Sequence, residues 1–266
     1  MRAHVTGSLS ANATRYWAGP TQVPDWLPLH RSALELFLLD ETPEGFFALY
    51  REPYGATPNG CALGGPRADN NCEFVVALFG RDRTERWAQR LNDFFSRPDH
   101  LEVQDVRYAG EVVYFNEACQ SYSREARGRC SSLVALDATT RQLRFRTRPL
   151  VSNGEILVLD AYVLASYGFT AEPDSLSLVS RATGRVAARM ELPVAAQHLA
   201  LVSTSPTRAV VDVSLAQRAV PWRISLEALD QPAPHFVPET PPPAEQPSRF
   251  PTLRMGMHDP VRPPPR

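Results

Sequence analysis

The residues best suited to chemistry are the four cysteines, which form two pairs with the same spacing. Ten residues separate Cys61 from Cys72, and ten separate Cys119 from Cys130. A four-cysteine zinc site normally uses ligands two to four residues apart, so this spacing argues against zinc. Because each pair is local, the sequence predicts two disulfides, Cys61–Cys72 and Cys119–Cys130, each stapling one loop. Closing a loop this short stabilises the fold by about 3 kcal/mol.

No other residues form a recognisable reactive set. The six histidines lie far apart and have no motif neighbours: His4, His30, His100, His198, His235 and His258. The chain also lacks a Gly-x-Ser-x-Gly nucleophile elbow, a P-loop and a dinucleotide fingerprint. We therefore predict no catalytic residue, no metal and no cofactor.

The overall composition excludes partners that are recognised by net charge. The chain has 266 residues, 28 basic and 29 acidic, and every basic residue is arginine. A formal charge of −1 creates no global field for nucleic acid or an anionic membrane. No window is apolar enough for a membrane span, and the first residues lack the apolar stretch of a secretion signal. The even cysteine count nevertheless indicates an oxidising compartment. We expect a periplasmic, cell-surface or secreted protein, with a cytoplasmic location as the alternative.

The two cysteine pairs belong to a longer internal repeat. When Cys72 is set over Cys130, residues 72–87 align with 130–145 at an offset of 58 residues. A third copy without cysteines covers 175–192, and a fainter fourth covers 208–226. Repeats at about 40 to 60 residues, each with short alternating strands, are typical of β-propellers.

Each copy contains short strand-like runs separated by Gly, Asn, Thr or the cysteine loop. The first three copies have four runs each, and the fourth has three: 34–40, 45–52, 72–79 and 84–91; 101–109, 111–118, 131–137 and 142–147; 155–160, 162–169, 175–180 and 185–192; 198–203, 208–214 and 220–226. At most one helical turn is expected across 92–96. The sequence thus predicts an all-β fold, a small propeller of about four four-stranded blades with the last one incomplete.

The two ends of the chain differ from this repeat region. Residues 1–33 are predicted to be an irregular N-terminal segment, in which Trp17, Trp26 and Leu27 pack on the outside of the first blade. The propeller is expected over 34–230. Residues 231–266 include twelve prolines, so we expect an extended or disordered tail or an arm that docks on a partner.

The stretch LVALDATTRQLRFRT, preceded by GEVVYFNEA, resembles the quinoprotein-like (PQQ-like) β-propeller repeat. In that repeat a buried strand ending in Ala-Leu-Asp leads through a Thr-Gly turn to an outer strand with an aromatic residue. The matching residues are Val134, Ala135, Leu136, Asp137, Thr140 and Phe145. The resemblance implies a propeller that serves as either a dehydrogenase or a scaffold. Quinone-binding members usually have about eight blades, which is twice what this chain supplies.

The loops between the second and third strands of each blade should emerge on one face of the disc. Tyrosine and arginine are common at interface hot spots, and these loops carry a predicted binding surface: Arg67, Asp69, Asn70, Tyr122, Arg124, Arg127, Tyr167, Phe169 and Glu172. The sequence favours a non-catalytic protein-interaction or scaffold propeller with a protein partner. The alternatives are a quinoprotein-like enzyme or cofactor-binding protein, and a structural subunit of a homo-oligomer or larger assembly docked through its proline-rich tail.

Overall fold

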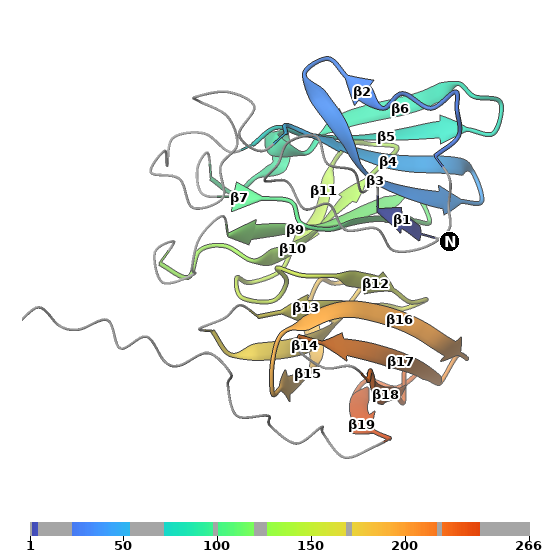
Figure 1. Cartoon of the computed structure of the whole chain (residues 1–266). Coiled ribbons are helices and arrows are strands. Elements are labelled where there is room, and N and C mark those ends of the chain that lie inside the picture. Colours follow the sequence, from blue (N-terminus) through green and yellow to red (C-terminus); the bar gives the residue numbers. More distant parts are fainter. Residues whose placement is uncertain are drawn as a thin grey trace, which may run out of the picture.

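The computed structural model describes residues 2–4, 23–53, 72–97, 101–119, 127–168, 172–216 and 220–239. Within these residues nearly all regular structure is strand, arranged in four antiparallel sheets that follow one another along the chain (Figure 1). This arrangement confirms the predicted all-β propeller. No helix in the described part is long and apolar enough to cross a membrane.

The first and second sheets contain the two cysteine-bearing repeats. The first has the order β1-β3-β4-β5-β6, and β2 also pairs with β3. In the second sheet β9 pairs with β10, β8 and β7. The bounds are β1 Arg2–His4, β2 His30–Arg31, β3 Leu34–Thr42, β4 Gly45–Arg51, β5 Phe74–Gly80, β6 Glu85–Arg90, the 3-10 helix η1 Leu91–Phe94, β7 Leu101–Glu102, β8 Val106–Ala109, β9 Val112–Cys119, β10 Ser132–Asp137 and β11 Leu143–Arg146.

The third and fourth sheets have four strands each, paired in chain order. Their bounds are β12 Ile156–Val158, β13 Tyr162–Tyr167, β14 Asp174–Ser180, β15 Val186–Leu192, β16 Ala196–Thr204, β17 Arg208–Leu215, β18 Trp222–Glu227 and β19 His235–Pro238. Central strands such as β4 and β10 are buried almost throughout, because a neighbouring element covers each face of the sheet. The outer strand β15 instead alternates between partly buried and exposed side chains.

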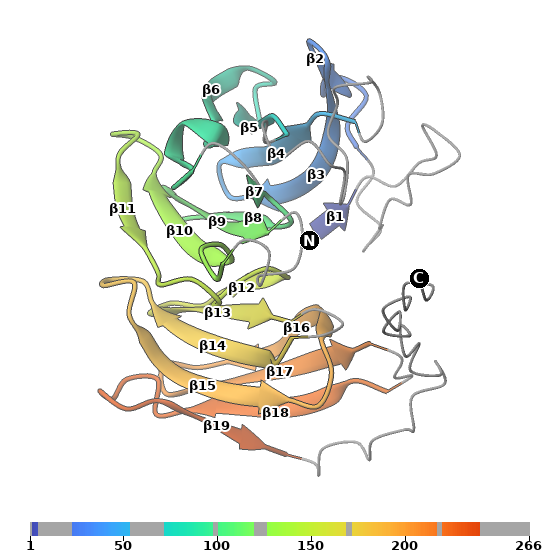
Figure 2. The ribbon, with the colours of Figure 1, turned by 90° about the vertical axis from the view of Figure 1, so that its left-hand side faces the viewer.

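The sheets are held together by apolar layers between successive pairs. One buried cluster joins the first and second sheets through residues such as Phe47 and Val134, a second joins the second and third sheets, and a third joins the third and fourth. The inner strands contact one another in the order β3, β8, β12, β16, and Figure 2 shows the sheets arranged around this centre. No apolar cluster of the described residues joins the fourth sheet to the first.

The outer face of the first sheet is covered by the segment before it. Leu27 is buried there, and the Trp26 ring lies edge-on to Phe46 and Phe79 at 5.7 and 6.2 Å. The expected packing of Trp26 and Leu27 is therefore confirmed, whereas Trp17 lies outside the described residues. This cover closes an apolar face that has no neighbouring sheet.

The structure differs from the sequence prediction in four places. Residues 2–4 and 30–31, expected within an irregular N-terminal segment, form β1 and β2 and pair with β3. The fourth sheet is complete, because β19 pairs with β18 and Phe236 packs against the apolar layer; residues 235–238 are thus a strand and not part of a proline-rich tail. The expected strand 101–109 is divided into β7 and β8. Strand β6 ends at Arg90, and the expected helical turn is η1.

Candidate functional site

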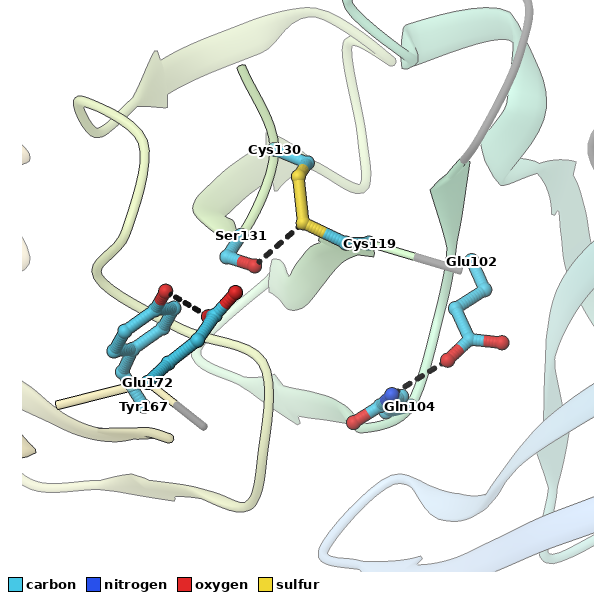
Figure 3. Close-up of a disulfide and its surroundings, with 7 residues drawn as sticks. All are labelled: Glu102, Gln104, Cys119, Cys130, Ser131, Tyr167 and Glu172. Atoms are coloured by element: carbon cyan, nitrogen blue, oxygen red, sulfur yellow. Dashed lines mark hydrogen bonds between the residues drawn. A yellow bond between two sulfur atoms is a disulfide. The ribbon is translucent and has the colours of Figure 1, made fainter. Parts of the chain in front are cut away.

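The second loop of the predicted surface is closed by a disulfide. Cys119, at the end of β9, bonds to Cys130, two residues before β10, with their Cα atoms 5.3 Å apart. Cys130 is fully buried against Leu101 and Phe95. The staple therefore fixes both ends of the loop onto the apolar base of the second sheet (Figure 3). The predicted pairing of Cys119 with Cys130 is confirmed.

The same staple also anchors the link between the second and third sheets. The Cys130 carbonyl accepts a hydrogen bond from the Leu150 amide at 3.1 Å, and the Ser131 carbonyl accepts from the amides of Val151 and Ser152 at 2.8 and 2.9 Å. Ser131 has a positive φ of 64°, which turns its carbonyl toward this link. The loop and the next sheet are thus held by one rigid joint.

The third loop meets this joint from the other side. Asn153 accepts a hydrogen bond from the Gly168 amide at 2.9 Å through its side-chain oxygen, and the Ser166 carbonyl accepts from the Asn153 amide at 3.1 Å. The Tyr167 hydroxyl donates to the Glu172 carboxylate, and Figure 3 shows this pair beside Ser131 and the disulfide. The described ends of the second and third loops are therefore joined through residues 152–153.

Two acidic residues, Glu172 and Asp174, lie where the third loop meets β14. Burial, together with the nearby charge of Glu172, raises the pKa of Asp174 to about 6. The Asp174 carboxyl lies against the Cα of Gly168, where a Cβ would come within 1.9 Å of its oxygen. Gly168, with φ of 157°, is thus required for this close approach. Asp174 gains its full charge only above pH 6, so the charge of this rim depends on pH.

The first loop has a different support at its end. The Asn92 side chain, from η1, donates to the Cys72 carbonyl at 2.7 Å and accepts from the Phe74 amide at 2.8 Å. Cys72 is buried and disulfide-bonded. Its predicted partner Cys61 lies outside the described residues, so the pairing Cys61–Cys72 stays a prediction. Sequence reasoning predicted the helical turn but missed these hydrogen bonds of Asn92.

The predicted surface residues are placed unevenly. Arg127 is exposed beside the disulfide, and Glu172 is half-buried. Tyr167 is expected at the surface, but its side chain is only 3% exposed because it lies within β13 and bonds to Glu172. It supports the loop and offers no ring to a partner. The other predicted residues lie outside the described part: Arg67, Asp69, Asn70, Tyr122, Arg124 and Phe169.

A buried charge cluster, which sequence reasoning missed, lies where the inner strands converge. Arg107 on β8 reaches Asp40 on β3 at 3.4 Å, Asp105 at 3.2 Å and Glu155, just before β12, at 3.5 Å. Its Nε donates to the Ile156 carbonyl at 2.7 Å. One guanidinium thus connects carboxylates from the first, second and third sheets.

The fourth sheet joins this cluster through a histidine. The Nδ1 of His198 on β16 lies 2.9 Å from a Glu155 oxygen, and the Leu199 amide donates to the same carboxylate. Asp105 in turn accepts from the Ile156 amide at 2.7 Å. The cluster therefore holds the inner strands of all four sheets in register.

The described rim residues offer charged side chains next to ordered loop ends. No group of three or more His, Cys, Asp and Glu side chains in the described part has the geometry to hold a metal ion. The rim instead presents rigid loop ends, an exposed arginine and a pair of carboxylates.

Comparisons with known proteins give only distant likenesses. No protein-family model matches the chain, and no curated protein matches it. Among solved structures, it is similar to the quinohemoprotein alcohol dehydrogenase ADHIIG from Pseudomonas putida HK5, with a TM-score of 0.38 and 13% identity over 62% of this chain and 32% of that one. It is also similar to BamB from Moraxella catarrhalis, with a TM-score of 0.33 and 14% identity over 72% of this chain and 60% of that one. The chain thus spans less than two thirds of either protein, and its fold is assigned from its own strand pairing.

Proposed function

We propose that this protein is a non-catalytic interaction propeller that binds a protein partner through the rim carrying the stapled loops. The observation that supports the proposal is the joint at Cys130 and Ser131, where a disulfide and backbone hydrogen bonds hold the end of the second loop against the link to the third sheet. A loop that is already fixed loses less conformational entropy when a partner binds it. Loops on a rigid scaffold are also where binding residues concentrate in proteins.

The charges of this rim indicate the chemistry of the partner. Arg127 is exposed on the second loop, and Glu172 and Asp174 stand on the third. Tyr122 and Arg124 belong to the second loop by sequence and have the side-chain types enriched at interface hot spots. We expect a protein surface with both acidic and basic groups, recognised by complementary pairs.

Disulfides support an exported location for this function. Structural disulfides persist in oxidising compartments such as the periplasm and the extracellular space. Cys119–Cys130 closes a loop and is buried at one end, which is typical of a structural bridge. We therefore propose that the partner is met outside the cytoplasm.

The test is comparative affinity capture from native extract. The double variant Tyr122→Ala with Arg124→Ala should lose at least one captured protein that the parent chain retains. The matched control is Arg185→Ala, an exposed arginine on the turn between β14 and β15 at the opposite rim. Equal capture by the folded double variant, the control and the parent would move the binding site away from the stapled loops. Absorbance beyond the aromatic band would instead support a cofactor-binding protein.

A further inference from the structure

An arginine of the third sheet fills the crevice between the second and third sheets at the rim opposite the stapled loops. Arg181 donates to the Tyr114 hydroxyl at 2.8 Å and to the Ala109 carbonyl at 3.2 Å, both in the second sheet. It also donates to the carbonyls of Leu159 and Asp160 at 3.1 and 2.8 Å. The crevice is thus a ready-made arginine site, with an aromatic ring and several carbonyl acceptors.

The equivalent position in the second sheet is Ala138. The Ala138 amide donates to the Glu111 carbonyl at 2.9 Å, as the Arg181 amide donates to the Ala161 carbonyl at 3.0 Å. Ala138 is the first residue of the turn from β10 to β11, and Arg181 is the first residue of the turn from β14 to β15. Alanine is too short to reach across to the first sheet. No arginine at this position therefore fills the crevice between the first and second sheets, whereas Arg181 fills the one between the second and third sheets.

A groove of about 540 Å³ opens at this position. Its apolar and aromatic lining comes from Leu78, Trp87, Tyr108 and Ala138. The Tyr108 ring is held by stacking on Phe47 at 5.4 Å, and the Trp87 ring lies 6.1 Å from Tyr108. The volume is in the range of sites that accept a few side chains or a small ligand.

Two carboxylates give the groove its polarity. Glu44, on the turn from β3 to β4, and Glu111, on the turn from β8 to β9, are exposed and line the groove. Burial raises the pKa of Tyr108, and the charges of Glu44 and Glu111 raise it further.

Two arginines also line the groove. Arg86 is engaged by Asp82 at 2.8 Å, and Arg141 stands at the rim beside Thr139. The Glu44 and Glu111 carboxylates are therefore the groups available to a cationic ligand. A groove lined by aromatic rings and carboxylates suits an arginine side chain, through cation–π contact and charge-assisted hydrogen bonds.

We propose that this groove binds an arginine and proline segment, and that its occupant is residues 259–266 of this chain, DPVRPPPR. The bound arginine lies between the first and second sheets in the way that Arg181 lies between the second and third sheets. Proline-rich segments dock on aromatic-lined grooves because their extended form is already ordered before binding. Arg262 and Arg266 flank three prolines and supply the charge that Glu44 and Glu111 complement.

The chain is long enough to deliver this segment. Twenty residues, 239–258, lie between β19 and the segment, and they can span up to about 70 Å when extended. The segment can therefore reach the groove of its own molecule or that of a second copy.

The test uses the full chain with Arg262→Ala and Arg266→Ala as the host, so that its own segment does not compete. A fluorescein-labelled peptide of residues 257–266 is titrated and its anisotropy is followed. Ala138→Arg in the host should fill the groove as Arg181 fills its neighbour and weaken peptide binding about tenfold or more. The matched control is Ala182→Arg, which adds the same charge to an exposed turn position of the third sheet at the same rim.

Peptide binding that is kept by the Ala182→Arg host and lost by the Ala138→Arg host supports the proposal. No binding to the host, or equal binding to both variants, overturns it. If the Ala138→Arg host does not fold, Glu44→Gln with Glu111→Gln replaces it, and unchanged binding by that variant overturns the proposal equally. Sedimentation of the unmutated chain then distinguishes docking within one molecule from docking between two.

Discussion

Replacing Arg107 tests whether the buried charge cluster holds the sheets together. The Arg107, Asp40 and Asp105 side chains are 14%, 14% and 3% exposed, and Glu155 is 9% exposed. Arg107→Met keeps most of the side-chain volume but removes the guanidinium that lies between the three carboxylates. Removing one partner of a buried ion pair costs about 3 to 5 kcal/mol. For a domain of this size that corresponds to a melting temperature lower by about 10 °C.

The assay is urea unfolding of the parent chain and two variants, followed by tryptophan fluorescence. The matched control is Arg86→Met, because Arg86 pairs with Asp82 at the surface with both side chains more than half exposed. Such a pair contributes about 1 kcal/mol or less. Equal stability of the two variants would refute the structural role of the cluster.

Three further outcomes follow from the described contacts. Replacing Cys119 and Cys130 together by alanine should lower the free energy of unfolding by about 3 kcal/mol. An unchanged denaturation midpoint under oxidising conditions would show that the disulfide does not stabilise the fold. Ending the chain after Glu239 should leave the melting temperature within a few degrees, whereas ending it after Asp230 removes β19 and should lower it clearly; the reverse order would contradict the pairing of β19 with β18. The pKa of Asp174 is raised to about 6 in the folded protein from a value near 3.8, so the parent chain loses stability as the pH rises between those values. Asp174→Asn does not have this loss, so the stability of the variant minus that of the parent should be larger at pH 7.5 than at pH 4. An equal difference at both pH values would be inconsistent with the burial of this carboxyl.

The local features of the fold were predictable from the sequence because the repeat preserves them. The offset of 58 residues places Arg83 over Arg141, and the third copy places Gly184 at the same point of its turn. All three have positive φ, at 68°, 57° and 69°. A Cβ on Gly184 would come within 2.5 Å of the Phe145 ring of the preceding sheet. The repeat thus specified strands, turns and the Cys119–Cys130 staple together.

The features that were missed depend on contacts between distant parts of the chain. Arg107 and Asp40 are 67 residues apart, and no local spacing marks them as partners. Strand β19 was hidden by its proline content, although Pro238 is tolerated at the end of an edge strand, where its missing N–H breaks no ladder bond. The groove was the exception, since aligning the third copy on the second sets Arg181 over Ala138. The sequence shows this difference between arginine and alanine, but only the structure shows that both positions lie at a crevice between two sheets.

The most direct test of the proposed function is site-specific photo-crosslinking in native extract. A photoreactive residue at position 172 reports on the rim with the stapled loops, and one at position 182 reports on the opposite rim. The proposal predicts a discrete protein adduct from position 172 that is absent from position 182 and is reduced when Tyr122 and Arg124 are replaced by alanine. Adducts of the same mass and yield from both positions, or from position 182 alone, would contradict it.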